Sequence, residues 1–182
     1  MVSADDLPDY FAKLNPVPAA ERPDLVAAPV AAALKHVPQA LVFEIDPELA
    51  DTAALCAEFD LPLETAANCV VIAGSRGEVD KTVACMALAT TRVDVNRTVR
   101  KKLDVRKCSF APMDYAVEAT GMEYGGITPV GMPDDWPIWI DRAVVDAGWV
   151  CIGSGVRSSK LLLPGTALAD LPGAEVVEGL AG

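Results

Sequence analysis

The apolar positions of the chain recur at two spacings, which predict two kinds of element. Val26, Val30 and Leu34 lie four residues apart and predict a helix over 24–35, because one face of a helix repeats at this interval. With aspartate or proline in the first turn, further helices are predicted to begin near Pro47, Asp94 and Pro112. Short apolar runs predict strands at 41–45, 69–73, 82–89, 107–110, 138–140, 149–152 and 160–163.

The succession of these elements predicts a single domain of the α+β class. The strands within 69–89 and within 149–163 are each joined by a glycine-containing connection and are expected to form antiparallel hairpins, the first with a long loop. Hairpins among irregularly placed helices favour a mixed sheet over a regular βαβ succession. Residues 1–23 are rich in proline and are predicted to form an arm on the domain, whereas the end of the chain has no clear pattern.

Composition and charge exclude several classes of protein. The chain has 182 residues, 52% of them hydrophobic, which is enough for the core of one domain. A net charge of -11 disfavours a protein that covers nucleic acid with its whole surface, but it permits one basic patch. No apolar run is long enough to span a membrane, and the acidic N-terminus is unlike a signal peptide, so a cytoplasmic protein is predicted.

The cysteines and the histidine limit the chemistry that the chain can perform. The five cysteines are widely spaced and form no CxxC pair, so buried, reduced thiols are expected. The one histidine, His36, cannot build a metal cage by itself, and a Ser-His-Asp triad is disfavoured for the same reason. A metal site is therefore disfavoured.

Two glycine-rich segments are candidates for ligand binding. Residues 121–133 contain four glycines and two prolines, and such a loop can present backbone N–H groups to an ester carbonyl or a phosphate. Residues 153–159 combine small residues with Arg157, which suits a phosphate or a terminal nucleotide. The alternative in each case is a set of tight turns that only connect neighbouring elements.

A third candidate is the basic segment, residues 92–107. It holds seven of the 15 basic residues and only two acidic ones. Arg97, Arg100 and Lys101 are spaced to share one face of a helix. That face is either an ordinary solvated surface or a contact with a phosphate backbone.

Four blocks of sequence resemble a known family. They are Arg92-Val-Asp94, residues 120–133 with the GxxxP core Gly125 to Pro129, Ile138-Trp-Ile-Asp141, and the block from Ile152-Gly-Ser-Gly-Val-Arg157 to Leu163. Their order is similar to that of the YbaK-type family of prolyl-tRNA editing domains, over about residues 25–165. The resemblance implies a domain over 24–165 built on a mixed, barrel-like sheet surrounded by helices, with a C-terminal tail over 166–182 packed on it. It also implies that the domain works without a metal or a cofactor.

The same resemblance implies a function. The ligand is expected to be the aminoacylated 3′ end of a tRNA, and the reaction is hydrolysis of its ester with help from the terminal ribose hydroxyl. An aminoacyl-tRNA synthetase is a further candidate partner, and the oligomeric state stays open. The expected catalytic residues are Asn68, Gly125, Gly126, Thr128 and Asp141; the expected substrate-binding residues are Ile127, Pro129, Gly153, Ser154, Gly155 and Arg157; and the expected tRNA-binding residues are Arg97, Arg100 and Lys101.

One position departs from the family pattern. Asn68 stands where members of the family usually carry a lysine at the start of the first long strand, and asparagine offers hydrogen bonds but no charge. Lys81 either supplies a cation from another direction or is simply solvated. Three functions are therefore compared: a free-standing deacylase, an inactive relative that binds tRNA or a synthetase, and a module that binds a small nucleotide or amino-acid derivative.

Overall fold

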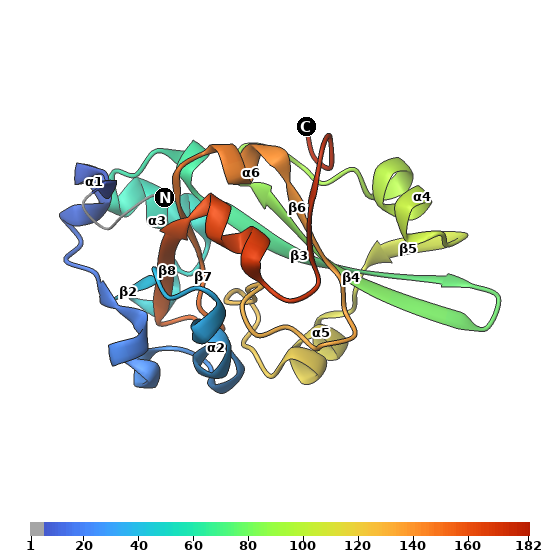
Figure 1. Ribbon diagram of the computed structural model, residues 1–182, viewed down its shortest axis with the longest axis horizontal. Helices are drawn as coiled ribbons and strands as arrows, with labels where there is room; N and C mark the ends of the chain where they lie inside the picture. The colour runs from blue at the N-terminus through green and yellow to red at the C-terminus, as the bar shows by residue number, and fades with distance from the viewer. Residues whose placement is uncertain (1–5) are drawn as a thin grey trace.

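The strands of the protein form two sheets, seen in a computed structural model that describes residues 6–182 (Figure 1). The first sheet has the order β1 (Val17–Pro18), β2 (Leu41–Glu44), β8 (Ser159–Pro164), β7 (Trp149–Gly153), and all its pairs are antiparallel. The second has the order β5 (Lys107–Phe110), β3 (Ala67–Arg76), β4 (Val79–Leu88), β6 (Ile138–Asp141), β9 (Ala174–Val177). Because β6 runs parallel to β4 and to β9, the second sheet is mixed.

The helices that surround the sheets are short. The α-helices are α1 (Asp9–Ala12), α2 (Ala28–Ala33), α3 (Thr52–Phe59), α4 (Arg100–Leu103), α5 (Met113–Thr120) and α6 (Arg142–Asp146). A π-helical turn, η7 (Val95–Val99), leads into α4. The 3₁₀ turns are η2 (Ala19–Glu21), η3 (Pro23–Leu25), η4 (Leu34–His36), η5 (Pro47–Leu49), η6 (Leu63–Thr65) and η8 (Gly165–Asp170). In the described residues, no helix has the length and apolar character needed to cross a membrane.

The predicted α+β class with a mixed sheet is confirmed, and so are the two antiparallel hairpins. The predicted barrel-like sheet takes the form of two sheets that meet where Ala66, just before β3, bridges Cys151 of β7. Within residues 6–182 the strands do not close into a barrel.

Several predicted boundaries are wrong for local reasons. The connection of the first hairpin is a turn of two residues, because only Gly77, at φ +64°, reverses the chain, whereas Gly74 continues β3. The predicted helix over 24–35 is divided, since Pro29 lies in the first turn of α2 and α2 therefore starts only at Ala28. The helix predicted from Pro47 is divided as well: Asp46 caps η5, and the Asp51 carboxylate caps α3 by accepting from the Ala54 N–H.

Both ends of the chain contribute to the core. Phe11 of α1 and Leu180 near the C-terminus are fully buried, and β9 extends the mixed sheet. Residues 1–5 of the predicted arm lie outside the described residues. Neither α6 nor β9 was predicted: α6 has only five residues, and β9 lies in the C-terminal part of the chain, where the sequence shows no clear pattern. Phe11 packs with Leu55, Trp149 and Leu162 in one cluster of the hydrophobic core, and this cluster holds α3 against the first sheet.

Candidate functional site

A cavity of about 680 Å³ opens between α3, β3, α5 and the glycine-rich loop, residues 121–133. Its lining changes character from one end to the other. At the α3 end it is polar, with Asp51, Thr52 and Lys160, whereas Ala111, Met113 and Ala116 make the α5 end apolar. The volume lies within the usual range for small-molecule sites, and the polarity gradient suits a ligand with one polar and one apolar part.

The wall of the cavity is formed where the glycine-rich loop meets the connection between β7 and β8. We call these two segments, residues 123–127 and 153–160, the glycine corner. Their main chains are joined directly: the Gly155 N–H donates to the Gly126 carbonyl oxygen at 2.7 Å, and the Glu123 N–H donates to the Gly155 carbonyl oxygen at 2.8 Å. The Glu123 carboxylate also accepts from the Arg157 N–H at 2.8 Å. These bonds hold the loop in one position relative to the strands.

Two glycines make this approach possible. A Cβ added to Gly126 would lie 2.7 Å from the Val156 carbonyl oxygen, and one added to Gly153 would lie 2.6 Å from the Gly126 carbonyl oxygen. Both contacts are with main-chain atoms that cannot rotate away. Glycine is therefore required at these positions so that the two segments can pack against each other.

The loop has unpaired backbone donors on both sides of Gly126. Gly125 and Ile127 line the cavity, and within the described part of the chain their N–H groups have no acceptor. The Gly126 N–H, in contrast, donates to the Glu123 carbonyl oxygen. Two N–H groups that flank a fixed residue form an arrangement that can hold the oxygen of an ester carbonyl.

Arg157 fixes the entrance of the loop. Its guanidinium donates to the carbonyl oxygens of Tyr124 at 3.2 Å and of Pro47 at 3.1 Å. The side chain thus joins the loop to η5, just before α3, while it also lines the cavity. Arg157 supplies a positive charge to the rim and holds the two walls together.

Asn68 lies on the opposite wall, in β3. Its amide oxygen accepts from the Thr52 hydroxyl at 2.6 Å. The bond leaves both N–H groups of the amide for a ligand in the cavity. By holding the amide oxygen, Thr52 of α3 fixes the orientation of the Asn68 amide, whose N–H groups can bind an oxygen atom of a ligand.

Lys160 is a charged residue of the cavity lining that was not among the candidates predicted from the sequence. It starts the apolar run of β8, its side chain is only 5% exposed, and its Nζ donates to the Ala50 carbonyl oxygen at 3.0 Å. Burial lowers the pKa of Lys160 below its usual value. A lysine within an otherwise apolar strand was the signal in the sequence that could have identified it.

The thiols in the cavity wall are protonated. Cys151 and Cys69 line the cavity, and all five cysteines are free. Burial raises the pKa of the Cys151 thiol to about 12, although the nearby Lys160 ammonium opposes the shift. Burial also raises the pKa of Cys69 well above its usual value. Neither thiol is activated as a nucleophile at neutral pH.

Four further residues predicted for the site, in or next to the glycine corner, do not line the cavity. Thr128, Pro129, Ser154 and Gly155 are buried, and the Thr128 hydroxyl has no hydrogen-bond partner in the described residues. The Ser154 hydroxyl donates to the Ser159 carbonyl oxygen at 2.9 Å. Their role in the structure is to shape the corner.

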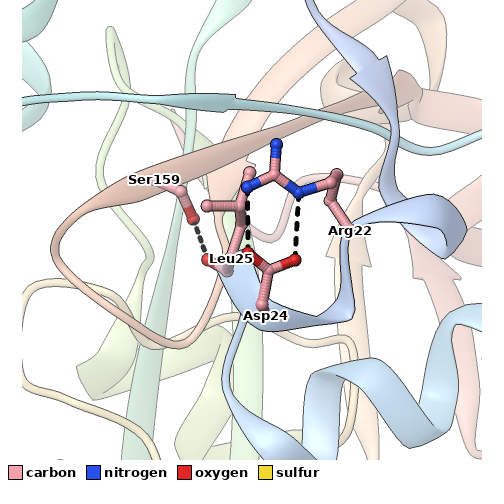
Figure 2. A network of polar contacts seen from close by, with 4 residues as sticks. All are labelled: Arg22, Asp24, Leu25 and Ser159. Carbon is pink, nitrogen blue, oxygen red and sulfur yellow. Dashed lines mark hydrogen bonds and ion pairs between the residues drawn. The ribbon is translucent and has the colours of Figure 1, made fainter.

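Ser159 anchors the corner to the N-terminal part of the chain. Figure 2 shows its hydroxyl directed at the Leu25 carbonyl oxygen, 2.6 Å away, beside the ion pair of Arg22 with Asp24. The Ala27 N–H donates to the Ser154 carbonyl oxygen in the same region. Arg22 and Asp24 are exposed, so their pair contributes little, whereas the buried Ser159 bond holds the start of β8 in place.

Asp141 is not brought to the cavity. It ends β6, is buried, and its carboxylate accepts from the N–H groups of Leu180 at 3.1 Å and Ala181 at 3.3 Å. These bonds fasten the C-terminal segment to the mixed sheet.

Arg97, Arg100 and Lys101 lie together outside the cavity, on η7 and α4. All three are exposed, and none forms an ion pair with another described residue, whereas Val99 and Leu103 on the other side of the segment are buried. Strand β5 connects this surface to the cavity: the Cys108 thiol donates to the Val95 carbonyl oxygen, and Phe110 reaches the cavity rim. Figure 1 shows α4 beside β5, at the far end of the molecule from α1.

The described residues contain no group of three or more His, Cys, Asp or Glu side chains that could hold a metal ion. The arrangement offers main-chain donors, an amide and two cations, so its chemistry is the binding of oxygen atoms.

Comparisons with known proteins identify the family and the fold. The model of a family described as the aminoacyl-tRNA editing domain matches residues 46–171. The structure of a candidate trans-editing enzyme for prolyl-tRNA synthetase is similar, with a TM-score of 0.71 and 18% identity over 83% of this chain and 94% of that one. A hypothetical protein gives a TM-score of 0.73 and 17% identity over 85% and 99%. A candidate signal transduction protein from Marinobacter aquaeolei gives 0.55 and 16%, over 85% of this chain and 30% of that longer one.

Proposed function

The chain belongs to the family of aminoacyl-tRNA editing domains, and we propose that it acts as a free-standing deacylase, which hydrolyses the ester of tRNAs carrying a wrong amino acid. The observation that carries the proposal is the pair of unpaired N–H groups at Gly125 and Ile127, two residues that line the cavity on a loop fixed by the glycine corner. In this proposal the two groups bind the ester carbonyl oxygen, on which negative charge develops when water attacks.

The reaction needs no nucleophile from the protein. Water adds to the ester carbonyl carbon, the bond from this carbon to the terminal ribose oxygen breaks, and the ribose oxygen takes up a proton. We propose that the neighbouring ribose hydroxyl positions the attacking water and that the Asn68 amide binds the ribose. The protonated Cys69 and Cys151 are consistent with such a mechanism, and His36 lies on η4, outside the cavity lining.

The rest of the tRNA is proposed to follow β5. The acceptor stem would contact Arg97, Arg100 and Lys101, and its single-stranded end would pass along β5 to the rim at Phe110, which is 63% exposed. Exposed aromatic rings stack on unpaired bases, and exposed cations bind the phosphate backbone. The cavity then receives only the terminal nucleotide and its amino acid.

The test is a panel of mischarged tRNAs. Ester loss from Ala-, Cys- and Ser-tRNA is expected to be faster with protein than without it, and substitution of Asn68 by alanine should reduce this rate about tenfold. The matched control is Asn96→Ala, which alters an exposed asparagine of the basic segment away from the cavity. If no ester in the panel is lost faster, the chain is not a deacylase for these substrates. Salt-sensitive binding of tRNA without turnover would then support the inactive relative, as the Asn68 position allows.

The role of the ribose is tested separately. A tRNA whose terminal ribose lacks the hydroxyl next to the ester should still bind with unchanged affinity, but its ester should be lost no faster than in buffer. Turnover at the normal rate would show that a protein group activates the water instead.

A further inference from the structure

Lys160 is held at the polar end of the cavity by its place in the sheet. It pairs directly with Gly153 across β8 and β7, and paired residues of antiparallel strands point to the same face. The Lys160 side chain therefore leaves the sheet on the side of the glycine corner and reaches Ala50, just before α3. Cys56 and Cys151 surround it there. The donors of Gly125 and Ile127 belong to the loop, so the two kinds of donor come from the two different segments of the glycine corner.

The ammonium group is incompletely satisfied. It carries three N–H donors, and among the described residues the Ala50 carbonyl oxygen is its one acceptor. No carboxylate forms an ion pair with it, although Asp51 and Thr52 line the same end of the cavity. Burying a cation with so few partners is costly, and burial accordingly lowers the pKa of Lys160. The cost is offset when a ligand brings oxygen acceptors to this end.

We propose that Lys160 determines specificity, by donating a hydrogen bond to an oxygen atom in the side chain of the bound amino acid. The proposal rests on the proposed function, in which the ester carbonyl lies at the loop, and it adds that the amino-acid side chain extends toward the α3 end of the cavity. A hydroxyl or a carboxylate satisfies the ammonium, whereas a methyl group displaces water from it and leaves its N–H groups unpaired. Sites with buried polar groups reject ligands that lack the matching atom far more strongly than apolar pockets reject a change of size.

The chain offers a matched control for this lysine. Lys81 in β4 also donates from Nζ to a backbone carbonyl oxygen, that of Leu103, at the same distance of 3.0 Å. Lys81 does not line the cavity. Replacing either lysine by methionine therefore removes a charge and one hydrogen bond to the main chain, but only Lys160→Met changes the cavity.

The experiment measures binding of adenosine derivatives that carry alanine, serine or aspartate on the 3′ position through a stable amide. The wild-type protein and Lys81→Met should bind the seryl or the aspartyl compound at least about tenfold more tightly than the alanyl compound. In Lys160→Met this preference should disappear, and in Lys160→Gln, which keeps two donors, part of it should return for serine. Preference for serine alone identifies a hydroxyl as the ligand group, and preference for aspartate alone identifies a carboxylate.

Three results would overturn the inference: equal affinity for the three compounds, a preference that persists in Lys160→Met, or no binding of any compound. Thermal unfolding of each variant shows whether it is folded, and Lys160→Gln serves if Lys160→Met is not. Because the amides cannot be hydrolysed, the outcome does not depend on turnover. A failure of the deacylase proposal appears instead in the ester panel, and the two failures are distinguishable.

Discussion

The glycine corner and the basic segment differ in how strictly the structure defines them. In the corner, main chains approach so closely that Gly126 and Gly153 cannot carry a Cβ, and Ser154 and Ser159 are bonded inside it. In the basic segment, Arg97, Arg100 and Lys101 are exposed and form no ion pair with another described residue. A reacting carbonyl group must be held in position to within a fraction of an ångström. Binding of a phosphate backbone, in contrast, depends mainly on the number of positive charges. The two regions are therefore expected to respond to mutation in different ways.

The largest effect is expected for Gly126→Ala. The new Cβ would meet the Val156 main chain at 2.7–2.8 Å, so the loop must move, and the Gly125 and Ile127 donors move with it. We expect kcat/KM for the ester to fall about 100-fold or more, mainly through kcat, in a single-turnover assay.

Gly148→Ala is the control for this change. Gly148 has φ +80° with open space where a Cβ would lie, so its substitution introduces backbone strain without a contact. It should lower stability by about 1 kcal/mol and leave turnover unchanged. Equal activity of Gly126→Ala and Gly148→Ala would mean that the loop does not hold the reacting group.

The next largest effect is expected for charge reversal in the basic segment. Changing Arg97, Arg100 and Lys101 together to glutamate should raise KM for tRNA by at least about tenfold at low salt and reduce the salt dependence of binding, while kcat at saturation stays the same. The control for net charge is a second triple variant, in which three exposed basic residues outside the basic segment are changed to glutamate: Lys13, Arg22 and Lys35. If both triple variants lose affinity equally, the contact is not confined to the basic segment.

Arg157→Lys is expected to have a smaller effect, because it keeps the charge and loses the geometry. A lysine cannot bond to the Tyr124 and Pro47 carbonyl oxygens in the planar arrangement of the guanidinium. We expect a loss of about fivefold to tenfold in kcat with little change in KM, measured by steady-state hydrolysis. Unchanged kcat and KM would mean that a positive charge at position 157 suffices, and that the bonds to Tyr124 and Pro47 do not position the loop.

The same contrast explains what could be predicted from the sequence. The hairpins within 69–89 and 149–163 follow from apolar runs and glycines, and the segment with Arg97 and Arg100 is visible as a local excess of charge. The sequence did not distinguish Gly125, which lines the cavity, from Gly126, which packs behind it, since that depends on contacts with Val156, thirty residues away. The position of Asp141 outside the cavity could not be predicted for the same reason, since its partners Leu180 and Ala181 lie about forty residues away; the contact of Lys160 with Ala50 is likewise distant, and only the lysine in an apolar strand was visible.

The smallest expected effect concerns pH, and it compares a thiol of each region. Cys151 lies beneath the glycine corner with its pKa raised to about 12, while Cys108, which contacts the basic segment, has a pKa raised by burial and opposed by Arg100. When the pKa of a thiol is higher in the folded than in the unfolded chain, the thiol stabilises the folded state fully at pH values below its unfolded-state pKa, near 8.5. This contribution is lost as the pH rises from the unfolded-state pKa toward the folded-state pKa. The free energy of unfolding should thus fall above about pH 9, by up to about 1.4 kcal/mol per pH unit for each such thiol. The measurement is a series of urea titrations between about pH 8 and 10.5 with reductant. Cys151→Ala should flatten the decline of the unfolding free energy more than Cys108→Ala does, because the core around Cys151 excludes water more completely than the edge strand β5. Equal slopes for the two variants would contradict this difference between the regions.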